Sequence, residues 1–542
     1  MKSQEERKSV WIVSVGTQQG PVRDRTVGQY ELRNLQTMCL EAAAAALSLG
    51  GNAKSYLDGV YFGTMGVMQS DATDRLHPRH IPAWLAQRLN LPTTTGWHSA
   101  DAHVPVLGTS DAGAQVFYRA VSDLQRGEKR TVLVVAGEQM WTADRPGLDR
   151  KARLRLDRKE HQDAIQTVVD PDESEPYGLT MLSIGDLLMS HIVWRSGLDE
   201  SVWRDWICDV TLRKHKSAEE FVYAMQTGLS GAVPGTKITS REDYFSRQTY
   251  GDWFRAEDVG APANGATAVI LTTDPKVMEQ KFAAGENGPW VQVLGVGHGE
   301  TNTALLRRQY PIDRPWSIRA ALRNVCADAG VSPRLLGDTG QLFGVLHDAF
   351  PSIEWVFLSE IARVARKDRS DTEVRDWVLA RWLEGSYNPF GGLCANGHAL
   401  GNTGLAQIAQ AVDYLGKRDR EWHQNGVLVT SVGSALTNIV ATLLWVSGPP
   451  GSAEEHAARE SRAPYRATEN DAHIWDFEPH ATPVNNQFQV VARTSWLRGV
   501  NAARAYVIQT SAGPTLALDK DSRTPAIPVG QFVTQETILE SL

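Results

Sequence analysis

The chain has 542 residues, of which 42% are hydrophobic and 22% are charged, and its formal net charge is -8. This composition is typical of a globular protein with a large core and two or three structural units. The basic stretch 149–161 also contains acidic residues, so the charge pattern argues against a nucleic-acid-binding protein.

The cysteines and the N-terminus bear on the compartment. Cys39, Cys208, Cys326 and Cys394 are far apart and form no CxxC pair, which argues against a zinc site or a disulfide framework. The N-terminal segment has no apolar signal-peptide core, and no run approaches the roughly 18 apolar residues of a membrane span. We therefore expect a cytoplasmic protein without a membrane span or a bound metal.

The first part of the chain alternates strands with helices. Hydrophobic periodicity predicts the following elements, in chain order: a strand at 9–17, a helix at 32–51, a strand at 57–65, a helix at 80–92, and a helix, a turn and a buried strand within 110–140. This order is typical of an α/β sheet with both faces covered.

Similar elements return after about residue 290. The pattern predicts a strand at 290–297, helices at 316–330, 353–367 and 405–416, and a strand, a turn and a strand within 425–447. The runs TVLVVAGEQM and GVLVTSVGSA occupy corresponding places in the two parts. We therefore expect a duplicated α/β unit.

The domain boundaries follow from changes in composition. We assign 1–140 and 241–285 to the first half, 141–240 to an inserted loop domain, and 286–449 to the second half. The Pro-, Gly- and Ala-rich segment 450–464 is predicted to be a linker, and 465–542 a small, mainly β extension with short strand-like runs.

Several segments resemble thiolases, particularly the sterol-carrier type. NPFGGLCANGHALGNTGLAQIAQAV at 388–412 is similar to the glycine-rich histidine loop of that family, and HDAFPSIEWVFLSEIA at 347–362 to its His-Asp-Cys-Phe motif. The segments 177–198 and 261–274 resemble the central loop domain and the strand that closes the first half. The likeness covers roughly residues 9–447.

The resemblance implies a duplicated, five-layered αβαβα fold that acts on acyl thioesters of coenzyme A. It also implies a homodimer and no tightly bound cofactor. The extra C-terminal segment resembles that of thiolase-like proteins found in bacteria, and we expect it to close over the active site, to cover a dimer surface or to contact a partner such as a small β-domain protein. In the family, the loop histidine donates a hydrogen bond to the thioester oxygen, a role that falls here on His398 and, beside it, His347.

The nucleophile departs from the family pattern. Ser110 stands where the family has its reactive cysteine, and it either accepts the acyl group with help from a histidine or only begins a helix. The acid/base cysteine of the His-Asp-Cys-Phe motif is replaced by Ala349. The late Cys-x-Gly loop corresponds to Ser431 and Gly433, where Gly433 can still offer a backbone N–H.

Two further side chains are candidates for proton transfer. Tyr387 directly precedes the histidine loop, and thiolase-like retro-aldolases use a tyrosine; the alternative is a packed aromatic ring. Cys394 lies in the loop itself and either replaces the missing thiols or is a small buried hydrophobe. The sequence thus predicts a thiolase-like acyltransferase or retro-aldolase that makes or breaks a carbon–carbon bond beside a thioester. The alternative is a non-catalytic thioester-binding or scaffolding subunit.

Overall fold

The computed structural model describes most of the chain. The described residues are 8–19, 22–23, 30–31, 34–66, 78–91, 103–107, 109–141, 177–220, 238–283, 290–302, 312–365, 369–417, 425–448, 452–468, 488–494, 504–510, 513–519 and 532–533, with isolated residues between 152 and 169 and at 526 and 529. Much of the predicted loop domain before residue 177, including most of the basic stretch, lies outside them.

A mixed nine-stranded sheet runs through the described core. Its strands are β1 (Val10–Gln19), β4 (Gly59–Thr64), β5 (His103–Leu107), β6 (Thr131–Glu138), β9 (Gly265–Thr272), β10 (Trp290–Glu300), β11 (Leu342–Val345), β12 (Gly426–Gly433) and β13 (Asn438–Ser447). They lie in the order β11-β12-β13-β10-β1-β9-β6-β4-β5. Outward from the central pair β1 and β10, the strands β9, β6 and β4 correspond to β13, β12 and β11. The order confirms the predicted duplication.

Two glycines in equivalent places support the duplication. Gly16 in β1 and Gly297 in β10 each lie against the first helix of their half, α1 (Leu35–Leu49) and α11 (Trp316–Ala329). A Cβ atom on either glycine would lie 2.2 Å from a helix carbonyl oxygen, that of Ala42 or Ala321. Only glycine allows this approach of strand and helix backbones.

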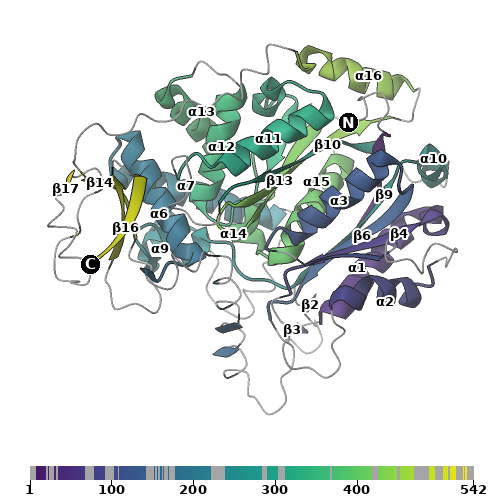
Figure 1. Ribbon diagram of the computed structural model, residues 1–542, viewed down its shortest axis with the longest axis horizontal. Helices are drawn as coiled ribbons and strands as arrows, with labels where there is room; N and C mark the ends of the chain where they lie inside the picture. Colours follow the sequence, from purple (N-terminus) through teal and green to yellow (C-terminus); the bar gives the residue numbers. More distant parts are fainter. Residues whose placement is uncertain are drawn as a thin grey trace.

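The helices form layers on both sides of the sheet (Figure 1). The amphipathic helices α3 (Ala112–Arg126) and α15 (Thr403–Lys417) contact each other in the middle, between the strands of the two halves. One outer layer contains α1, α2 (Ile81–Arg88) and α10 (Pro275–Ala283), and the other contains α11 and α12 (Pro351–Ala365). Three clusters of buried apolar side chains fill the spaces between these layers. This is the predicted five-layered arrangement.

The loop domain packs beside α12. Its described helices are α6 (Met181–Ser196), α7 (Glu200–Glu220) and α9 (Arg241–Ser246). Tyr244 and Phe254 join the same apolar cluster as α6 and α7, and Asp258 accepts a hydrogen bond from Thr211 of α7 at 2.6 Å. Residues 241–258 therefore pack with the loop domain, although the sequence analysis placed them in the first half.

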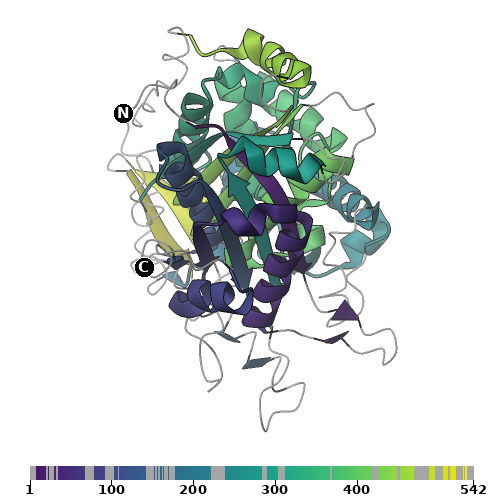
Figure 2. The same cartoon turned by 90° about the vertical axis from the view of Figure 1, so that its right-hand side faces the viewer.

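The C-terminal part combines one helix with a small sheet. The segment predicted to be a linker contains α16 (Ala453–Arg462), whose N-cap Ser452 accepts a hydrogen bond from the backbone N–H of Glu455 at 3.1 Å. Beyond it, β14 (Phe488–Thr494), β15 (Arg504–Thr510), β16 (Gly513–Asp519) and β17 (Phe532–Val533) form an antiparallel sheet that contacts α6. Figures 1 and 2 show this sheet, in yellow, at the side of the molecule. The mainly β extension was predicted correctly.

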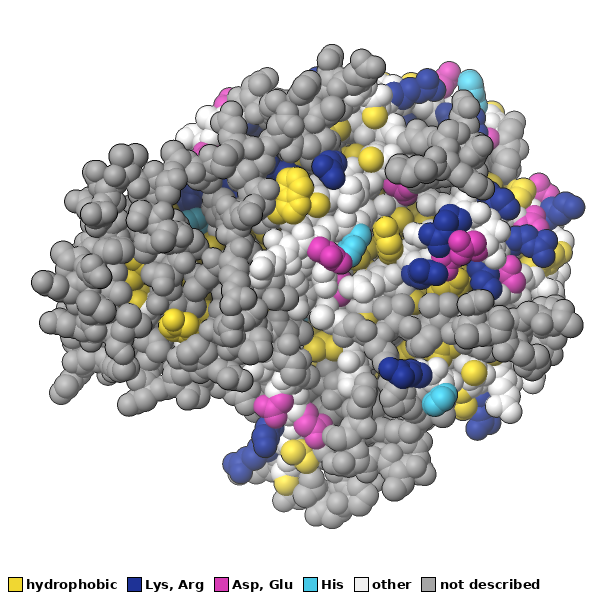
Figure 3. Space-filling view, in the orientation of Figure 1, with side chains coloured by type: hydrophobic (Ala, Val, Ile, Leu, Met, Phe, Trp, Pro, Cys, Tyr) yellow, Lys and Arg dark blue, Asp and Glu magenta, His cyan; other side chains and the backbone are white. Residues whose placement is uncertain are grey.

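Two surface properties concern the expected partners. On the face shown in Figure 3, described basic and acidic side chains are interspersed. Within the described residues, no helix is both long and apolar enough to cross a bilayer.

Candidate functional site

A pocket of about 80 Å³ lies where the two halves and the loop domain meet. Its wall contains Ser110, His347 and His398, three of the candidate residues from the sequence. The other lining residues are mostly apolar and come from several elements: Met65, Met181, Leu182, Val259, Gly260, Ala349, Phe350, Ile353, Leu400, Val432 and Ser434. Because a water molecule takes up roughly 10–15 Å³ of such a cavity, the pocket holds several waters or a short acyl group.

His347 follows β11 and precedes α12. Its backbone N–H donates to the Thr430 hydroxyl at 3.1 Å, which fixes the loop against β12. The side chain is 2% exposed, and among the described residues its Nδ1 has no hydrogen-bond partner. Burial, together with the neighbouring His398, lowers the pKa of His347 well below its ordinary value. The imidazole is therefore neutral near pH 7.

His398 lies in the loop between α14 (Gly392–Asn396) and α15. Its Nδ1 lies 2.8 Å from the hydroxyl oxygen of Thr403, the first residue of α15. Burial lowers the pKa of His398 to about 4, so this imidazole is neutral as well. The rings of His398 and His347 meet edge to face, with centroids 4.9 Å apart. The two histidine motifs, distant in sequence, thus form one neutral pair on the pocket wall.

A short segment at 260–263 holds both histidine loops. The backbone N–H of Gly260 donates to the carbonyl of Ala349 at 2.9 Å. The backbone N–H of His398 donates to Ala261 at 2.7 Å, and the His398 carbonyl accepts from Ala263 at 3.1 Å. This segment leads from the loop domain into β9, so the first half of the chain fixes the geometry of histidines that belong to the second half.

Ser110 is half-buried just before α3. Its hydroxyl donates to the carbonyl of Val432 at 2.9 Å. The next residue, Asp111, is fully buried and accepts hydrogen bonds from Thr109 at 2.6 Å and Gln115 at 2.8 Å. In the described structure no hydrogen bond joins Ser110 to either histidine.

Ser431 and Gly433 lie on β12 but do not line the pocket, whereas Val432 between them does. Alternate residues of a strand point to opposite faces, which accounts for this difference. Ser431 is 1% exposed, and Gly433 faces Asp111, whose Oδ1 would lie 2.3 Å from a Cβ atom on the glycine.

The structure does not bring Tyr387 and Cys394 to the pocket. The Tyr387 hydroxyl donates to the carbonyl of Leu336 at 3.0 Å, and its ring fills the space beside Gly344. Burial raises the pKa of Tyr387. Cys394 lies on α14 with its thiol 3.7 Å from the Gly391 carbonyl, and burial raises the pKa of this thiol to about 12. Neither group is poised to transfer protons there.

Sequence analysis missed a buried ion cluster behind the histidines. Lys214 of α7 lies 2.5 Å from Asp348 and 2.6 Å from Glu354, and all three side chains are at most 3% exposed. Asp348 follows His347 directly and accepts from the backbone N–H of Leu393, 2.8 Å away, in the His398 loop. Burial alone would lower the pKa of Lys214, but Asp348 and Glu354 raise it above its ordinary value. The cluster joins the loop domain to both histidine loops.

The apolar wall was also missed. Met181 and Leu182 begin α6, and Phe350 and Ile353 lie at the start of α12. All four fall within segments that resembled thiolases, but apolar residues at helix starts give no sign of a pocket. Backbone strain is one further signal of the site: Ser434 lines the pocket with a φ of 55°.

No resident metal site is evident in the described part of the chain. There, no three His, Cys, Asp or Glu side chains are grouped so that they could hold an ion. The four cysteines are on α1, α7, α11 and α14, and none of them is among the residues that line the pocket.

Comparisons with known proteins agree with this architecture. No protein-family model matches the chain. An acetyl-CoA acetyltransferase of Methanocaldococcus jannaschii is 22% identical over 420 residues, which are 77% of this chain and 93% of that protein.

Solved structures extend the comparison. A monomeric SCP2-thiolase-like protein of Mycobacterium smegmatis matches with a TM-score of 0.60 and 14% identity, over 98% of this chain and 97% of its own. The Ltp2-ChsH2(DUF35) aldolase matches with a TM-score of 0.55 and 16% identity, over 81% of this chain and 98% of its own. The first match is long enough to include the C-terminal sheet. These likenesses confirm the resemblance found in the motifs, and the chain has the thiolase fold.

Proposed function

We propose that this protein binds an acyl-CoA thioester in the histidine pocket and makes or breaks a carbon–carbon bond beside the thioester carbonyl. The observation that supports this proposal most directly is the pair of neutral imidazoles, His347 and His398, on the wall of a mostly apolar pocket. In this reaction class negative charge develops on the thioester oxygen, and neutral N–H donors in a buried site stabilise it.

The contact with Thr403 supports a donor role for His398. The contact allows the Thr403 hydroxyl to donate to Nδ1, and in that tautomer the proton lies on Nε2, the nitrogen that remains for a ligand. For His347, the buried Nδ1 has no hydrogen-bond partner among the described residues. An unpaired N–H donor at this nitrogen would destabilise the folded protein more than an unpaired lone pair. In these tautomers both imidazoles carry an Nε2–H, which can donate to the thioester oxygen.

The apolar wall supports an acyl substrate. Met181, Leu182, Phe350 and Ile353 offer a hydrocarbon surface beside the histidines. The acetyltransferase and aldolase among the similar proteins are consistent with chemistry at or beside an acyl carbonyl.

The surroundings of Ser110 favour a reaction without an acyl-enzyme. Its hydroxyl donates to the Val432 carbonyl, and in the described structure no hydrogen bond joins it to either histidine. A direct enolate reaction, as in a retro-aldol cleavage, needs the oxyanion donors and a base. Since both imidazoles donate, the substrate proton would pass to a water molecule, for which the pocket has room. The same hydrogen bond of Ser110 is consistent with the second candidate function, a thioester-binding or scaffolding subunit.

Exchange of α-protons tests the proposal without knowledge of the second substrate. The protein is incubated with acetyl-CoA or propionyl-CoA in D₂O, and deuterium at the α-carbon is measured by mass spectrometry. We expect enzyme-dependent exchange, with a loss of about 100-fold in His398→Ala, because one oxyanion donor contributes about that much. Thr403→Val, which keeps the shape but removes the partner of Nδ1, is expected to lower exchange without lowering thioester binding.

Intact-protein mass spectrometry separates the alternatives. An acyl adduct that disappears in Ser110→Ala, but not in Cys394→Ala, would establish a serine acyl-enzyme and refute the direct enolate route. Thioester binding without exchange and without an adduct would favour the scaffolding subunit. Absence of thioester binding would refute both candidates. Gel filtration of the same protein tests the predicted homodimer.

A further inference from the structure

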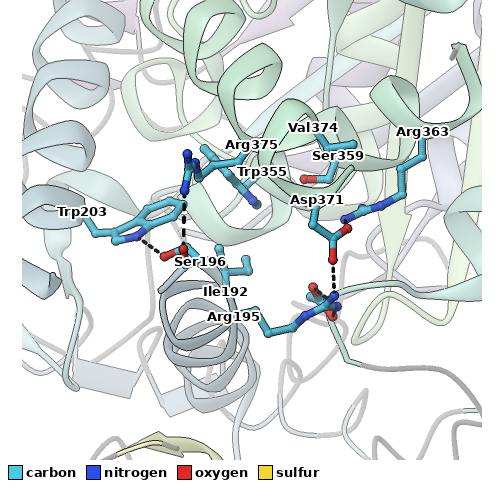
Figure 4. A pocket seen from close by; sticks show the side chains of 11 residues that line it. Ile192, Arg195, Ser196, Trp203, Trp355, Ser359, Arg363, Asp371, Val374 and Arg375 are labelled. Atoms are coloured by element: carbon cyan, nitrogen blue, oxygen red, sulfur yellow. Dashed lines mark hydrogen bonds and ion pairs between the residues drawn. The ribbon is translucent and has the colours of Figure 1, made fainter. Parts of the chain in front are cut away.

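A second cavity, of about 50 Å³, lies at the other ends of the helices that line the histidine pocket. Ile192, Arg195 and Ser196 come from the end of α6, and Trp355, Ser359 and Arg363 come from α12 (Figure 4). The rest of the lining is Trp203 of α7, Asp313, and three residues of α13 (Asp371–Glu384), which are Asp371, Val374 and Arg375. Three arginines thus surround a cavity that the proposed thioester chemistry does not use.

The two carboxylates in the lining are already neutralised. Both carboxylate oxygens of Asp313 accept from Nη1 of Arg195, at 3.0 and 2.9 Å. Asp371 accepts from Arg195 at 2.9 Å, Arg314 at 2.7 Å and Arg363 at 3.3 Å. Burial alone would raise both pKa values, but His191 and then Arg195 lower the pKa of Asp313, and neighbouring arginines lower that of Asp371, so both stay ionised.

Other donors around the cavity are not fully used. Arg363 makes only long contacts, at 3.3 Å to Asp371 and 3.4 Å to Glu360. Arg375 binds the exposed side chain of Asp376 and lies 3.5 Å from the Ser196 carbonyl. These guanidinium groups, with five N–H donors each, therefore keep donors for another acceptor.

A buried hydroxyl faces the same space. Ser359 is 4% exposed and lines the cavity from α12. Figure 4 shows it between Trp355 and Asp371, and no hydrogen bond joins its hydroxyl to another described residue. A buried hydroxyl that contacts a cavity in this way is suited to a ligand oxygen.

The charge balance favours an anion. Among the described residues, the ion pairs connected through Asp371 and Glu360 contain four arginines (Arg195, Arg314, Arg319 and Arg363) and three carboxylates (Asp313, Glu360 and Asp371). Arg375 and Asp376 form a separate pair. Within this described network the arginines outnumber the carboxylates by one. The N-terminus of α13 adds a partial positive charge beside the cavity.

We propose that this cavity binds a small oxyanion, a phosphate or a carboxylate group, through Arg363, Arg375 and Ser359. The chemistry fits because planar guanidinium groups bind such oxygens through paired N–H donors. Because a water molecule takes up roughly 10–15 Å³ of such a cavity, this volume has room for a few oxygen-sized atoms. A bound oxyanion would link α6 of the loop domain to α12 and α13 of the second half.

The test measures binding and does not depend on catalysis. Thermal unfolding and isothermal titration calorimetry are carried out on the full chain with sodium phosphate, sodium acetate and sodium chloride at matched ionic strength. Arg375→Gln removes a charged donor of the cavity that now contacts only the exposed Asp376 carboxylate and, at 3.5 Å, the Ser196 carbonyl among the described residues. Ser359→Ala removes the hydroxyl that lines the cavity. Arg381→Gln, on the same helix but outside the lining, is the matched control.

We expect a saturable rise in melting temperature and one bound anion per chain. Losing a charged donor should weaken binding roughly tenfold or more in Arg375→Gln, whereas Arg381→Gln should bind like the parent. Saturation by phosphate alone identifies a phosphate group, and saturation by acetate identifies a carboxylate. No saturation up to about 50 mM, or equal shifts in all variants, would overturn the proposal because only a general salt effect on stability would remain.

Discussion

Replacement of Lys214 by methionine should destabilise the protein far more than replacement of its partner Glu354 by glutamine. Methionine fills much of the lysine volume, but it leaves Asp348 and Glu354 buried together without a cation. Removing one member of a buried ion pair costs about 3–5 kcal/mol. In Glu354→Gln, Lys214 keeps Asp348, and the amide oxygen can still accept from Trp382 or Asn388, which now donate at 2.6 and 2.7 Å.

The expected shift is measurable by thermal unfolding. At about 2.1 cal/mol/K for each of 542 residues, the unfolding entropy is about 1.1 kcal/mol/K, so Lys214→Met should lower the melting temperature by about 3–4 °C. The double variant Lys214→Met with Glu354→Gln should recover part of this loss because one carboxylate charge is gone.

The pH dependence gives a second reading of the same experiment. In Lys214→Met, Asp348 keeps the burial that raises its pKa and loses the lysine that opposes this shift, so folding takes up a proton as the pH falls. The destabilisation should therefore be largest near pH 8 and decrease toward pH 5. Equal melting temperatures for Lys214→Met and Glu354→Gln, or a loss independent of pH, would refute the reasoning.

Two further predictions concern the pocket. Gly433→Ala places a Cβ atom 2.3 Å from the Asp111 carboxylate and the Thr109 hydroxyl, so it should lower the melting temperature by several degrees. In the control Gly197→Ala, the added Cβ atom has nothing within 4 Å, and the change should cost only about 1 kcal/mol of backbone strain. Similar losses of stability in both variants would contradict this prediction. Because His398 has a pKa of about 4 when folded and about 6.5 when unfolded, stability should fall as the pH is lowered from 6.5 to 4, by up to about 3 kcal/mol, and His398→Gln should flatten that dependence in urea titrations.

The sequence predicted the layers because they depend on local patterns. Apolar periodicity and glycine stops located the strands and helices of both halves, and the repeated order revealed the duplication. The helix α16 was missed because proline, glycine and alanine flank it, although Ser452 and Glu455 formed a recognisable cap.

The residues of the candidate site were predicted only where they belong to one of the motifs that resemble thiolases. His347 and His398 meet as the resemblance implied. Tyr387 packs its ring beside Gly344, which was the stated alternative to a role in proton transfer. The buried role of Lys214 could not be predicted, because a lysine on a helix with many charged residues is expected to be solvent-exposed. Its burial depends on which two loops α7 meets, and no local pattern contains that information.

The segment 260–263 has a consequence for how the chain could be divided. A cut between α10 and β10 would give two fragments, each with its own strands of the central sheet. Both histidines would go with the second fragment, whereas the backbone groups that fix their loops would go with the first. Reassociation would have to occur along β1 and β10, where Trp11 lies opposite Gln292. Recovered thioester binding would then report the joining of two pieces of chain, which makes the pocket a natural basis for a split-protein sensor.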